Sequence, residues 1–266
     1  LNVHPNKDGS LLFENPRAFQ GKGVTTWEGL IKSVRAKVKG TKVKIRLGAS
    51  SGEWKAMVAD EAARTTFAKN IKTVLEKNKL DGIDLDFEWA ENEKEYKDYS
   101  LAILKMREVL GNKYLFSVSL HPVCYKISKE AIEAVDFISL QCYGPSPVRF
   151  PIEKYCSDIQ MVLEYGIPKE KLVAGVPFYG ATKDNSKKTE AYFNFVQNGL
   201  VTSPAQNEVI YQGDTYVFDG QDNIRIKTRY AKEQKLKGMM SWDLATDLPL
   251  SDSRSLLKTM TEELRE

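Results

Sequence analysis

The sequence predicts an α/β fold of the (β/α)8 TIM-barrel type, and three observations carry this prediction. Apolar segments of strand length alternate with segments of helical periodicity, which indicates parallel strands joined by crossover helices. The chain has 266 residues, close to the roughly 250 that such a barrel needs. The motifs of open nucleotide-binding sheets, G-x-G-x-x-G and the P-loop, do not occur.

Six segments are rich in Val, Ile, Leu and aromatic residues, a composition typical of buried strands. A barrel needs eight strands, and the first 25 residues read as a turn-rich loop, so we expect the first strands to lie upstream of Leu1. The predicted strands are residues 41–50, 82–89, 114–121, 136–144, 171–180 and 238–244.

Helical patterns fill the intervals between these strands. The interval 181–237 is too long for a single connection. We therefore expect a small inserted subdomain at about residues 185–222, with one helix and short strands. It would lie between the predicted strands 171–180 and 238–244, which are strands 7 and 8 of the barrel. Residues 1–266 are expected to form one barrel domain. The predicted helices are Trp54–Lys79, Glu91–Leu110, Asp222–Lys235 and Ser251–Leu264.

Composition limits the function classes. Lys and Arg total 39 against 36 Asp and Glu, and a net charge of +3 gives little reason to expect nucleic-acid binding. No apolar run approaches the roughly 20 residues of a membrane span. With two histidines and no C-x-x-C among three cysteines, we expect no metal site of that kind and no cofactor. Free thiols and a Cys124–Cys156 disulfide both stay open, and a monomer is expected.

The segment LDGIDLDFEWAEN (80–92) places carboxylates at every second position, Asp84, Asp86 and Glu88. Alternate side chains of a strand point to opposite faces, so these three share the face that points into a barrel lumen. Carboxylates so close together in a low-dielectric interior share protons, which raises at least one pKa and suits a general acid. Glu88 is the candidate acid, because barrel active sites lie at the carboxyl ends of strands.

Two alternative roles stay open for this acidic strand. The acidic face could meet solvent, or the oxygen ligands could bind magnesium or calcium. Asp81 has the opposite parity and precedes the strand, so a loop or capping role is expected for it.

The spacing Asp81-x-x-Asp84-x-Asp86-x-Glu88 resembles the D-x-x-D-x-D-x-E signature of glycoside hydrolase family 18, the chitinases and endo-β-N-acetylglucosaminidases. Other segments resemble the family's sixth, seventh and eighth strands in the same order. They are VDFISLQCYG (135–144), KLVAGVPFYG (171–180) and the approach to Trp242, and the resemblance covers roughly residues 41–247.

This resemblance implies a retaining mechanism assisted by the substrate, an exception to the usual scheme with two carboxylates. Glu88 would protonate the glycosidic oxygen, and the substrate's own 2-acetamido oxygen would be the nucleophile. Asp86 would hold the acetamido N–H, and Asp84 would pair with Asp86 and help to set its protonation.

The resemblance also implies substrate contacts. Tyr143 matches the tyrosine that orients the acetamido carbonyl, and Gln141 shares its parity. Trp242 matches the tryptophan under the sugar at the cleavage site, and Tyr179 is a further candidate contact. Ordinary core packing is the alternative for Tyr143 and Trp242.

The chain departs from the family pattern in two places. The sixth-strand motif M-x-Y-D or M-x-Y-N reads Gln141-Cys142-Tyr143-Gly144. The third-strand motif S-x-G-G reads Arg46-Leu47-Gly48-Ala49. The glutamine resembles a variant seen among endo-β-N-acetylglucosaminidases and some plant chitinases.

The leading hypothesis is a glycosidase that cleaves β-1,4-linked N-acetylglucosamine in chitin or chitooligosaccharides. The alternatives are an endo-β-N-acetylglucosaminidase on N-glycan cores, a glycan-binding lectin on the same barrel, and an oxygen-ligand metalloenzyme. The expected partner is an oligosaccharide or polysaccharide that contains N-acetylglucosamine. Such polymers lie outside cells, so an extracellular, periplasmic or cell-surface location is expected.

Overall fold

A computed structural model describes residues 1–14, 24–144, 150–184 and 188–266. The chain divides into two compact units, which are described one at a time. The first contains Leu1–Leu120 and Cys124–Ile138, and the second contains His121–Val123 and Ser139–Glu266.

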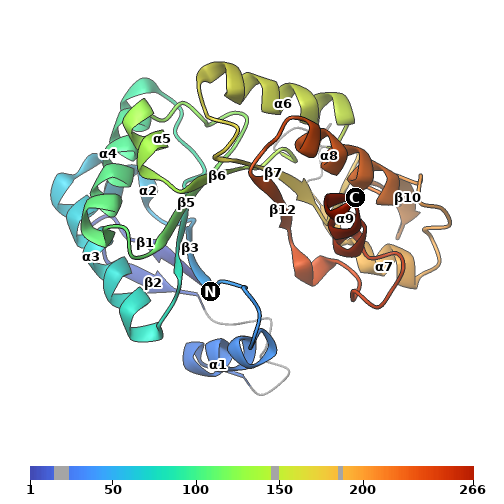
Figure 1. The fold of residues 1–266 in the computed structure, drawn as a ribbon, viewed down its shortest axis with the longest axis horizontal. Helices are drawn as coiled ribbons and strands as arrows, with labels where there is room; N and C mark the ends of the chain where they lie inside the picture. Colours follow the sequence, from blue (N-terminus) through green and yellow to red (C-terminus); the bar gives the residue numbers. More distant parts are fainter. Residues whose placement is uncertain (15–23, 145–149, 185–187) are drawn as a thin grey trace. The chain divides into compact units, whose positions relative to one another are not determined.

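The first unit is built on five neighbouring strands in the order β5-β4-β3-β1-β2 (Figure 1). β1, β3, β4 and β5 run parallel to one another, and the edge strand β2 is antiparallel to β1. The register aligns Gly48 with Asp84 and Asp84 with Ser117. The bounds are β1 (Asn2–Pro5), β2 (Leu11–Phe13), β3 (Arg46–Ser50), β4 (Gly82–Asp86) and β5 (Leu115–Leu120).

The start of the chain corrects the sequence prediction. Residues 2–5, expected within a turn-rich loop, form β1 and pair in parallel with β3 at Asn2↔Gly48 and Val3↔Ala49. Four residues that include a histidine and a proline carry little strand signal of their own. The pairing with β3 and the complete burial of Val3 define this strand.

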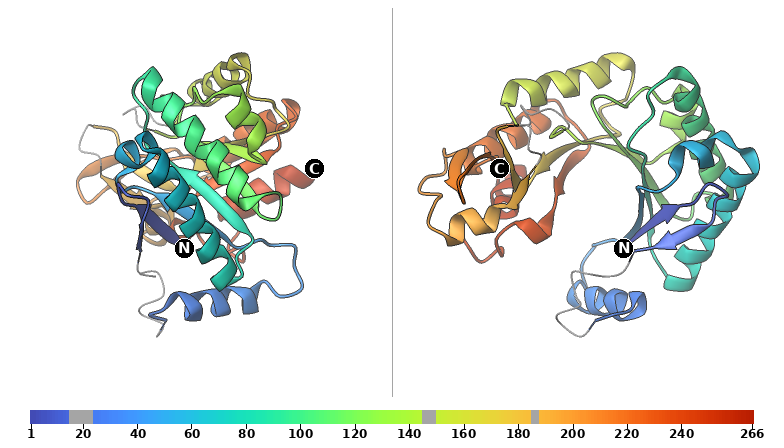
Figure 2. Two further views of the ribbon diagram at one scale, coloured as in Figure 1. Left: turned by 90° about the vertical axis from the view of Figure 1, so that its left-hand side faces the viewer. Right: turned by 180° about the vertical axis from the view of Figure 1, so that it is seen from behind.

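Helices cover the strands of the first unit, and α3 and α4 pack side by side (Figures 1 and 2). Where one helix was expected over 54–79, the structure has two, because the Asp60 backbone is extended. The Asp60 carboxylate accepts a hydrogen bond from the Ala63 amide at 2.7 Å and thereby caps α3. The bounds are α1 (Trp27–Lys37), α2 (Trp54–Ala59), α3 (Glu61–Asn78), α4 (Glu93–Leu110) and α5 (Lys129–Ala134).

The second unit contains strands in the order β12-β7-β6, and the division between the units falls within β6. β12 is parallel to β7, with Trp242 aligned with Pro177. All six predicted strands are therefore present as β3 to β7 and β12, with shorter bounds than expected. The bounds here are β6 (Phe137–Leu140), β7 (Leu172–Pro177), β12 (Gly238–Trp242), α6 (Ile152–Tyr165), α8 (Gln221–Glu233) and α9 (Leu256–Arg265).

A separate antiparallel sheet in the order β10-β11-β8-β9 lies between β7 and β12 in the sequence. The helix and short strands expected there are α7, β10 and β11. The sheet begins at Tyr179, earlier than the expected 185, because the predicted strand 171–180 divides at Phe178 into β7 and β8. The bounds are β8 (Tyr179–Thr182), β9 (Thr189–Ala191), α7 (Tyr192–Gln197), β10 (Glu208–Tyr211) and β11 (Asp214–Val217).

A buried ion pair connects α8 to the residues before it. Lys227 Nζ lies 2.6 Å from Asp219 Oδ2, and both side chains are almost wholly excluded from solvent. The same Nζ donates to the Phe150 carbonyl at 2.8 Å and lies 5.5 Å from the centroid of the Tyr155 ring. The buried ammonium therefore has two oxygen acceptors and a nearby aromatic ring.

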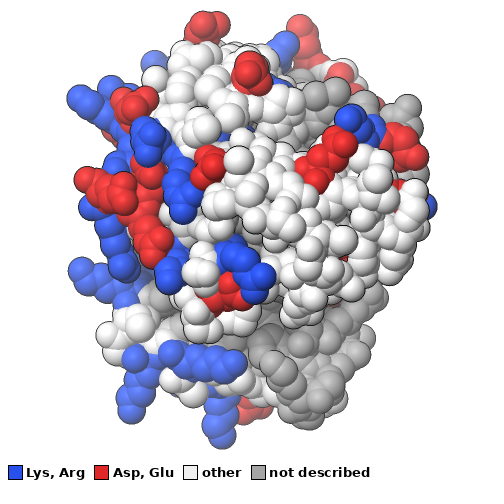
Figure 3. Space-filling model, turned by 90° about the vertical axis from the view of Figure 1, so that its right-hand side faces the viewer, with Lys and Arg blue, Asp and Glu red and all other residues white. Residues whose placement is uncertain are grey.

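The surface charges agree with the small net charge of +3. On the face drawn in Figure 3, basic and acidic side chains are interleaved along the left of the view. Among the described residues, no helix has both the length and the apolar content of a membrane span.

Candidate active site

The acidic strand keeps the predicted alternation. Ile83 and Leu85 are completely buried, while Asp84 and Asp86 on the opposite face are partly exposed. β4 ends at Asp86, earlier than the expected residue 89, and Glu88 lies two residues beyond it and is exposed. Of the three carboxylates, the one beyond the carboxyl end of the strand is thus the most exposed to solvent.

Aromatic packing anchors the backbone around these carboxylates. Phe87 stacks on Trp54 at the start of α2, with ring centroids 5.6 Å apart. Tyr99 of α4 donates from its hydroxyl to the Leu85 carbonyl at 3.3 Å. The Ala90 amide donates to the Cys124 thiol at 3.3 Å. These contacts hold the backbone at Leu85, Phe87 and Ala90, the residues that flank Asp86 and Glu88.

Asp84 lies in a network of hydrogen bonds with two neighbouring strands. Its Oδ2 accepts a hydrogen bond from Ser119 Oγ at 2.7 Å, and its Oδ1 accepts one from Ser117 Oγ. Arg46 Nη1 on β3 lies 3.9 Å from Asp84 Oδ1 and donates to Ser117 Oγ. Burial raises the pKa of Asp84, and the serine hydrogen bonds and the Arg46 charge oppose that rise.

The cysteines do not form the disulfide that the sequence left open. Cys124, Cys142 and Cys156 are all free thiols. Burial raises the pKa of Cys124 to about 11 and raises that of Cys142 further, so both thiols are protonated at neutral pH. Within the described residues, no group of three His, Cys, Asp or Glu side chains is arranged to hold a metal ion.

Tyr143 and Gln141 follow β6 in the second unit, and both are buried. β6 ends at Leu140, and the Cys142 amide donates to the Leu140 carbonyl in a tight turn. The strand alternation that was expected to place Gln141 and Tyr143 on one face therefore does not extend to these residues. The Tyr143 ring meets the Tyr179 ring edge-on, with centroids 6.4 Å apart. The two predicted tyrosines are therefore brought together.

A glycine makes this arrangement of Tyr143 feasible. A Cβ atom on Gly175 of β7 would lie 3.0 Å from Tyr143 Cε1 and 2.8 Å from Met240 Cε. The same Cβ atom would lie 2.6 Å from the Leu140 carbonyl oxygen, so a larger residue at position 175 would force the end of β6 or the side chains around it to shift.

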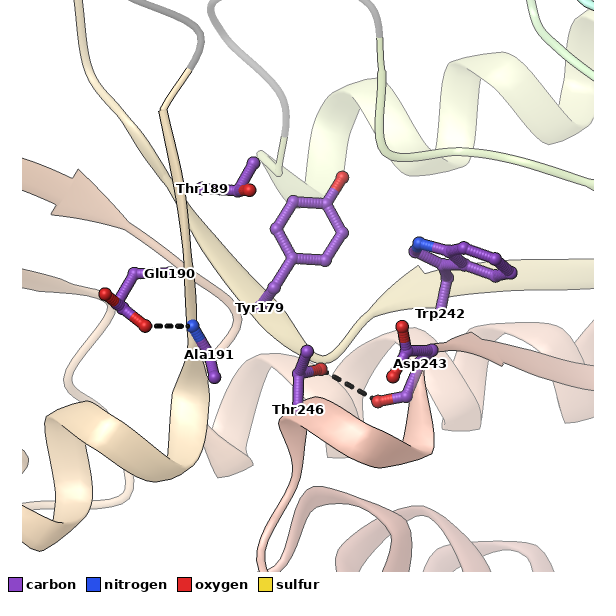
Figure 4. Close-up of a pocket in the computed structure, with 7 residues that line it drawn as sticks. All are labelled: Tyr179, Thr189, Glu190, Ala191, Trp242, Asp243 and Thr246. Atoms are coloured by element: carbon purple, nitrogen blue, oxygen red, sulfur yellow. Dashed lines mark hydrogen bonds between the residues drawn. The ribbon is translucent and has the colours of Figure 1, made fainter. Parts of the chain in front are cut away.

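A pocket of about 270 Å³ opens between the ends of β8, β9 and β12 (Figure 4). Trp242 and Tyr179 are two of its walls, and Trp242 is 57% exposed. The Phe178 amide donates to the Trp242 carbonyl at 2.7 Å, and this bond fixes the end of β12. The other lining residues are Thr189, Glu190, Ala191, Asp243 and Thr246.

The pocket carries carboxylates that the sequence analysis did not single out. Glu190 lies on β9, and its Oε1 accepts hydrogen bonds from the Ala191 amide at 2.8 Å and from Asn194 Nδ2 at 2.7 Å. Asp243 Oδ1 accepts one from the Ala245 amide at 2.7 Å. An exposed indole beside carboxylate acceptors suits a ligand with an apolar C–H face and hydroxyl groups at its edge.

Arg46, Ser117 and Ser119 were missed as well. A signal for the serines existed, because in LFSVSL (115–120) they alternate with buried residues as the carboxylates of β4 do. In the first unit, the structure places Asp84 and Asp86 on one face of β4 with Glu88 just beyond. In the second, it brings Tyr143, Tyr179 and Trp242 to neighbouring positions and buries Gln141.

The chain has relatives among known proteins. The sequence model of glycosyl hydrolases family 18 matches residues 5–247. "Probable chitinase 2" of Drosophila melanogaster is 23% identical over 273 residues, which cover 77% of this chain and 56% of that protein. The chain thus spans little more than half the length of this relative.

Solved structures share the fold. A chitinase from Bacteroides thetaiotaomicron superposes with a TM-score of 0.84 at 20% identity, over 99% of this chain and 86% of that one. A chitinase-like agglutinin from Robinia pseudoacacia gives a TM-score of 0.77 at 18% identity, over 98% and 92%. At such identities the likeness establishes the fold, and the predicted (β/α)8 barrel class is confirmed.

Proposed function

Because the chain belongs to glycosyl hydrolases family 18, we propose that it is a glycosidase acting on β-1,4-linked N-acetylglucosamine glycans of the chitin type. The observation that carries the proposal is the row of carboxylates on β4. Asp84 and Asp86 lie on one face, and the exposed Glu88 follows at the carboxyl end. Active sites of such barrels lie at the carboxyl ends of the strands, and Glu88 is a solvent-accessible acid at that end.

Glu88 is the proposed general acid. Its proton passes to the glycosidic oxygen as the bond to the anomeric carbon breaks. The carbonyl oxygen of the substrate's 2-acetamido group attacks the anomeric carbon from the opposite face and closes an oxazolinium ring. Water then opens that ring, with Glu88 as the base, and the anomeric configuration is retained.

Asp86 and Asp84 are proposed to serve the acetamido group. Asp86 accepts the acetamido N–H and stabilises the positive charge that develops on the ring, an interaction that is stronger in the transition state than in the ground state. Asp84 is the partner of Asp86 in proton sharing, and Ser117 and Ser119 orient its carboxylate. The pKa values of such a row belong to the cluster of carboxylates.

The second unit is proposed to supply substrate contacts. Trp242 offers an exposed indole face for the apolar side of a pyranose, next to carboxylates that accept hydrogen bonds from sugar hydroxyl groups. Tyr143 is proposed to orient the acetamido carbonyl, with Tyr179 packed against it. Gln141 is proposed as a further substrate contact.

One observation favours a second substrate class. The motif Gln141-Cys142-Tyr143-Gly144 lacks the Asp or Asn of the common family pattern and resembles that of endo-β-N-acetylglucosaminidases. N-glycan cores are therefore the second candidate substrate. Binding without turnover is the third candidate, since one structural relative carries the name agglutinin. Glu88 favours turnover, because a lectin has no need of a general acid.

The proposal is tested by release of a chromophore from a chitobiose glycoside, run beside deglycosylation of an N-glycosylated protein. Turnover of the glycoside, inhibited by a thiazoline analogue of N-acetylglucosamine, is the expected result, because the thiazoline mimics the bicyclic intermediate. Cleavage of the glycoprotein alone would favour N-glycan cores as the substrate. Oligosaccharide binding without turnover of either substrate would favour the lectin.

Polymers that contain N-acetylglucosamine lie outside cells. We therefore also propose an extracellular, periplasmic or cell-surface location.

A further inference from the structure

Arg46 stands on β3 where the motif S-x-G-G of the resemblance begins with serine. We propose that Arg46 is a positioning residue for hydrolysis: it is the counter-ion of Asp84 and sets how the proton is shared along the row Asp84, Asp86 and Glu88. The assignment of this pairing to hydrolysis rests on the proposed function. The pairing itself rests on the geometry of the first unit.

The guanidinium of Arg46 is held at Asp84 in two ways. Directly, Arg46 Nη1 lies 3.9 Å from Asp84 Oδ1. Indirectly, the same nitrogen donates to Ser117 Oγ, and that hydroxyl donates to Asp84 Oδ1. A serine in the place of Arg46 could supply a hydrogen bond, but only the arginine supplies a full positive charge.

The position of this charge is fixed by packing. The guanidinium carbon of Arg46 lies 4.7 Å from the centroid of the Phe137 ring. A planar guanidinium stacks on an aromatic face in a way that a lysine ammonium cannot, and its orientation is thereby restricted. The side chains of Arg46 and Asp84 are only 26% and 19% exposed, so solvent screens their attraction incompletely.

The other polar groups around Asp84 do not replace this cation. Ser117 and Ser119 from β5 are neutral donors, and Asp86 on β4 is a further acid. Behind the strand, burial raises the pKa of Tyr99 on α4 well above its ordinary value, so its hydroxyl is neutral.

Charged groups at the start of β4 have another carboxylate as their partner. Arg35 of α1 and Lys44 before β3 both lie 3.9 Å from oxygens of Asp81. Asp81 also accepts the Ile45 amide at 2.8 Å, in agreement with the loop role expected for it. Among the described residues, the cation within ion-pair distance of Asp84 is therefore Arg46.

The consequence concerns pH. Burial raises the pKa of Asp84, and the positive charge of Arg46 lowers it. A cation at this distance from a carboxylate typically lowers its pKa by about 1–3 units. Without Arg46, the row of coupled carboxylates around Asp84 would take up its shared proton at higher pH. The acidic limb of the pH profile of kcat/KM should then move to higher pH.

The test is a carboxylate titration by NMR on protein labelled with ¹³C at the aspartate side-chain carboxyl, with the Asp84 signal assigned through Asp84→Asn. In Arg46→Ser we expect the Asp84 midpoint to rise by about 1 pH unit. The acidic limb of glycoside hydrolysis should rise with it. In Arg46→Lys, which keeps the charge and loses the stacking, the rise should be less than half as large.

Arg107→Met is the matched control. Arg107 Nη2 lies 3.1 Å from Asp136 Oδ2, and its guanidinium stands 5.3 Å from the Phe116 ring centroid, so it reproduces both contacts elsewhere in the first unit. The Asp84 midpoint should not move in this variant. An unchanged midpoint in folded Arg46→Ser, or an equal shift in Arg107→Met, overturns the proposal whether or not the protein hydrolyses glycans. If the Asp84 midpoint moves in a protein that shows no turnover, Arg46 is still the counter-ion of Asp84, and the proposed function is wrong.

Discussion

Each unit of the molecule contains a carboxylate paired with a cation, and the two pairs are built differently. In the second unit, Asp219 and Lys227 lie 2.6 Å apart with side chains 0% and 1% exposed. In the first, Asp84 and Arg46 lie 3.9 Å apart with side chains 19% and 26% exposed. Burial raises the pKa of both carboxylates, and the paired cation opposes the rise in each.

The difference lies in what surrounds each pair. Asp219 also accepts from Asn223 at 3.2 Å, and Lys227 also donates to a backbone carbonyl, so the polar groups are satisfied and closed off. Asp84 instead continues a strand face toward Asp86 and the exposed Glu88. A sealed pair holds one protonation state, whereas an open pair beside other acids can exchange protons with them. Stability tests should therefore separate the pairs.

Removal of the sealed cation should have the largest effect on stability. In Lys227→Met, the Asp219 carboxylate stays buried without its counter-ion. We expect the free energy of unfolding to fall by about 3–5 kcal/mol, measured by urea denaturation at pH 7.

The control lies on the same helix. Arg225 and Asp222 form an ion pair of 2.8 Å on the surface of α8, and Arg225→Met should cost less than about 1 kcal/mol. If the two variants lost similar amounts, the distinction between a sealed pair and a surface pair would fail.

A buried histidine of the second unit, His121, should make the stability depend on pH. Burial lowers its pKa to about 4 from an ordinary value of 6.5, and its Nδ1 accepts the Val123 amide at 3.4 Å, as a neutral ring can. The unfolded chain binds a proton at His121 below pH 6.5, and the folded chain does so only near pH 4. The contribution of His121 to the free energy of unfolding is thus fully present above pH 6.5. It is lost as the pH falls, by about 3 kcal/mol at pH 4.

This loss is measured as the difference between urea unfolding at pH 7 and at pH 4.5, in the wild type and in His121→Asn. The comparison between variants removes the contribution of the carboxylates, which titrate in the same window. The wild type should lose more stability than the variant on acidification. Equal losses would mean that His121 is protonated in the folded protein.

The smallest expected effect is on substrate binding in the second unit. Trp242→Ala should raise KM for the chitobiose glycoside roughly tenfold, about 1.4 kcal/mol, because the apolar face of a sugar loses its indole. The value of kcat should stay within about threefold. Tyr165→Ala, which removes another partly exposed aromatic ring outside the pocket, should leave KM unchanged. A fall in kcat with unchanged KM would move Trp242 from binding to chemistry.

The features that could be predicted from the sequence are those that depend on residues adjacent along the chain. The alternation that put Asp84 and Asp86 opposite Ile83 and Leu85 needs only the two-residue period of a strand, and the structure confirms it. The same rule failed at Gln141 and Tyr143, because β6 ends at Leu140 and the chain turns there.

What could not be predicted depends on partners far along the chain. β1 is a strand because β3 pairs with it, and Arg46 meets Ser117 because its long side chain crosses β4 to reach β5. Over a shorter separation, Glu190 lines the pocket beside Trp242 because β9 pairs with β8, with Gly180 aligned with Glu190. These contacts join residues far apart in the sequence: Asn2 and Ser50 are 48 residues apart, and Arg46 and Ser117 are 71 residues apart.

The proposed hydrolysis requires Glu88 as the general acid. We would measure kcat on a chitobiose glycoside and, by calorimetry, the Kd of an N-acetylglucosamine tetramer, for wild type and Glu88→Gln. The amide cannot donate the proton, so kcat should fall about 100-fold to 10,000-fold. The Kd should stay within about twofold, because glutamine keeps the shape of the side chain. A variant that retained a near-wild-type kcat would contradict the assignment of Glu88 and the mechanism that rests on it.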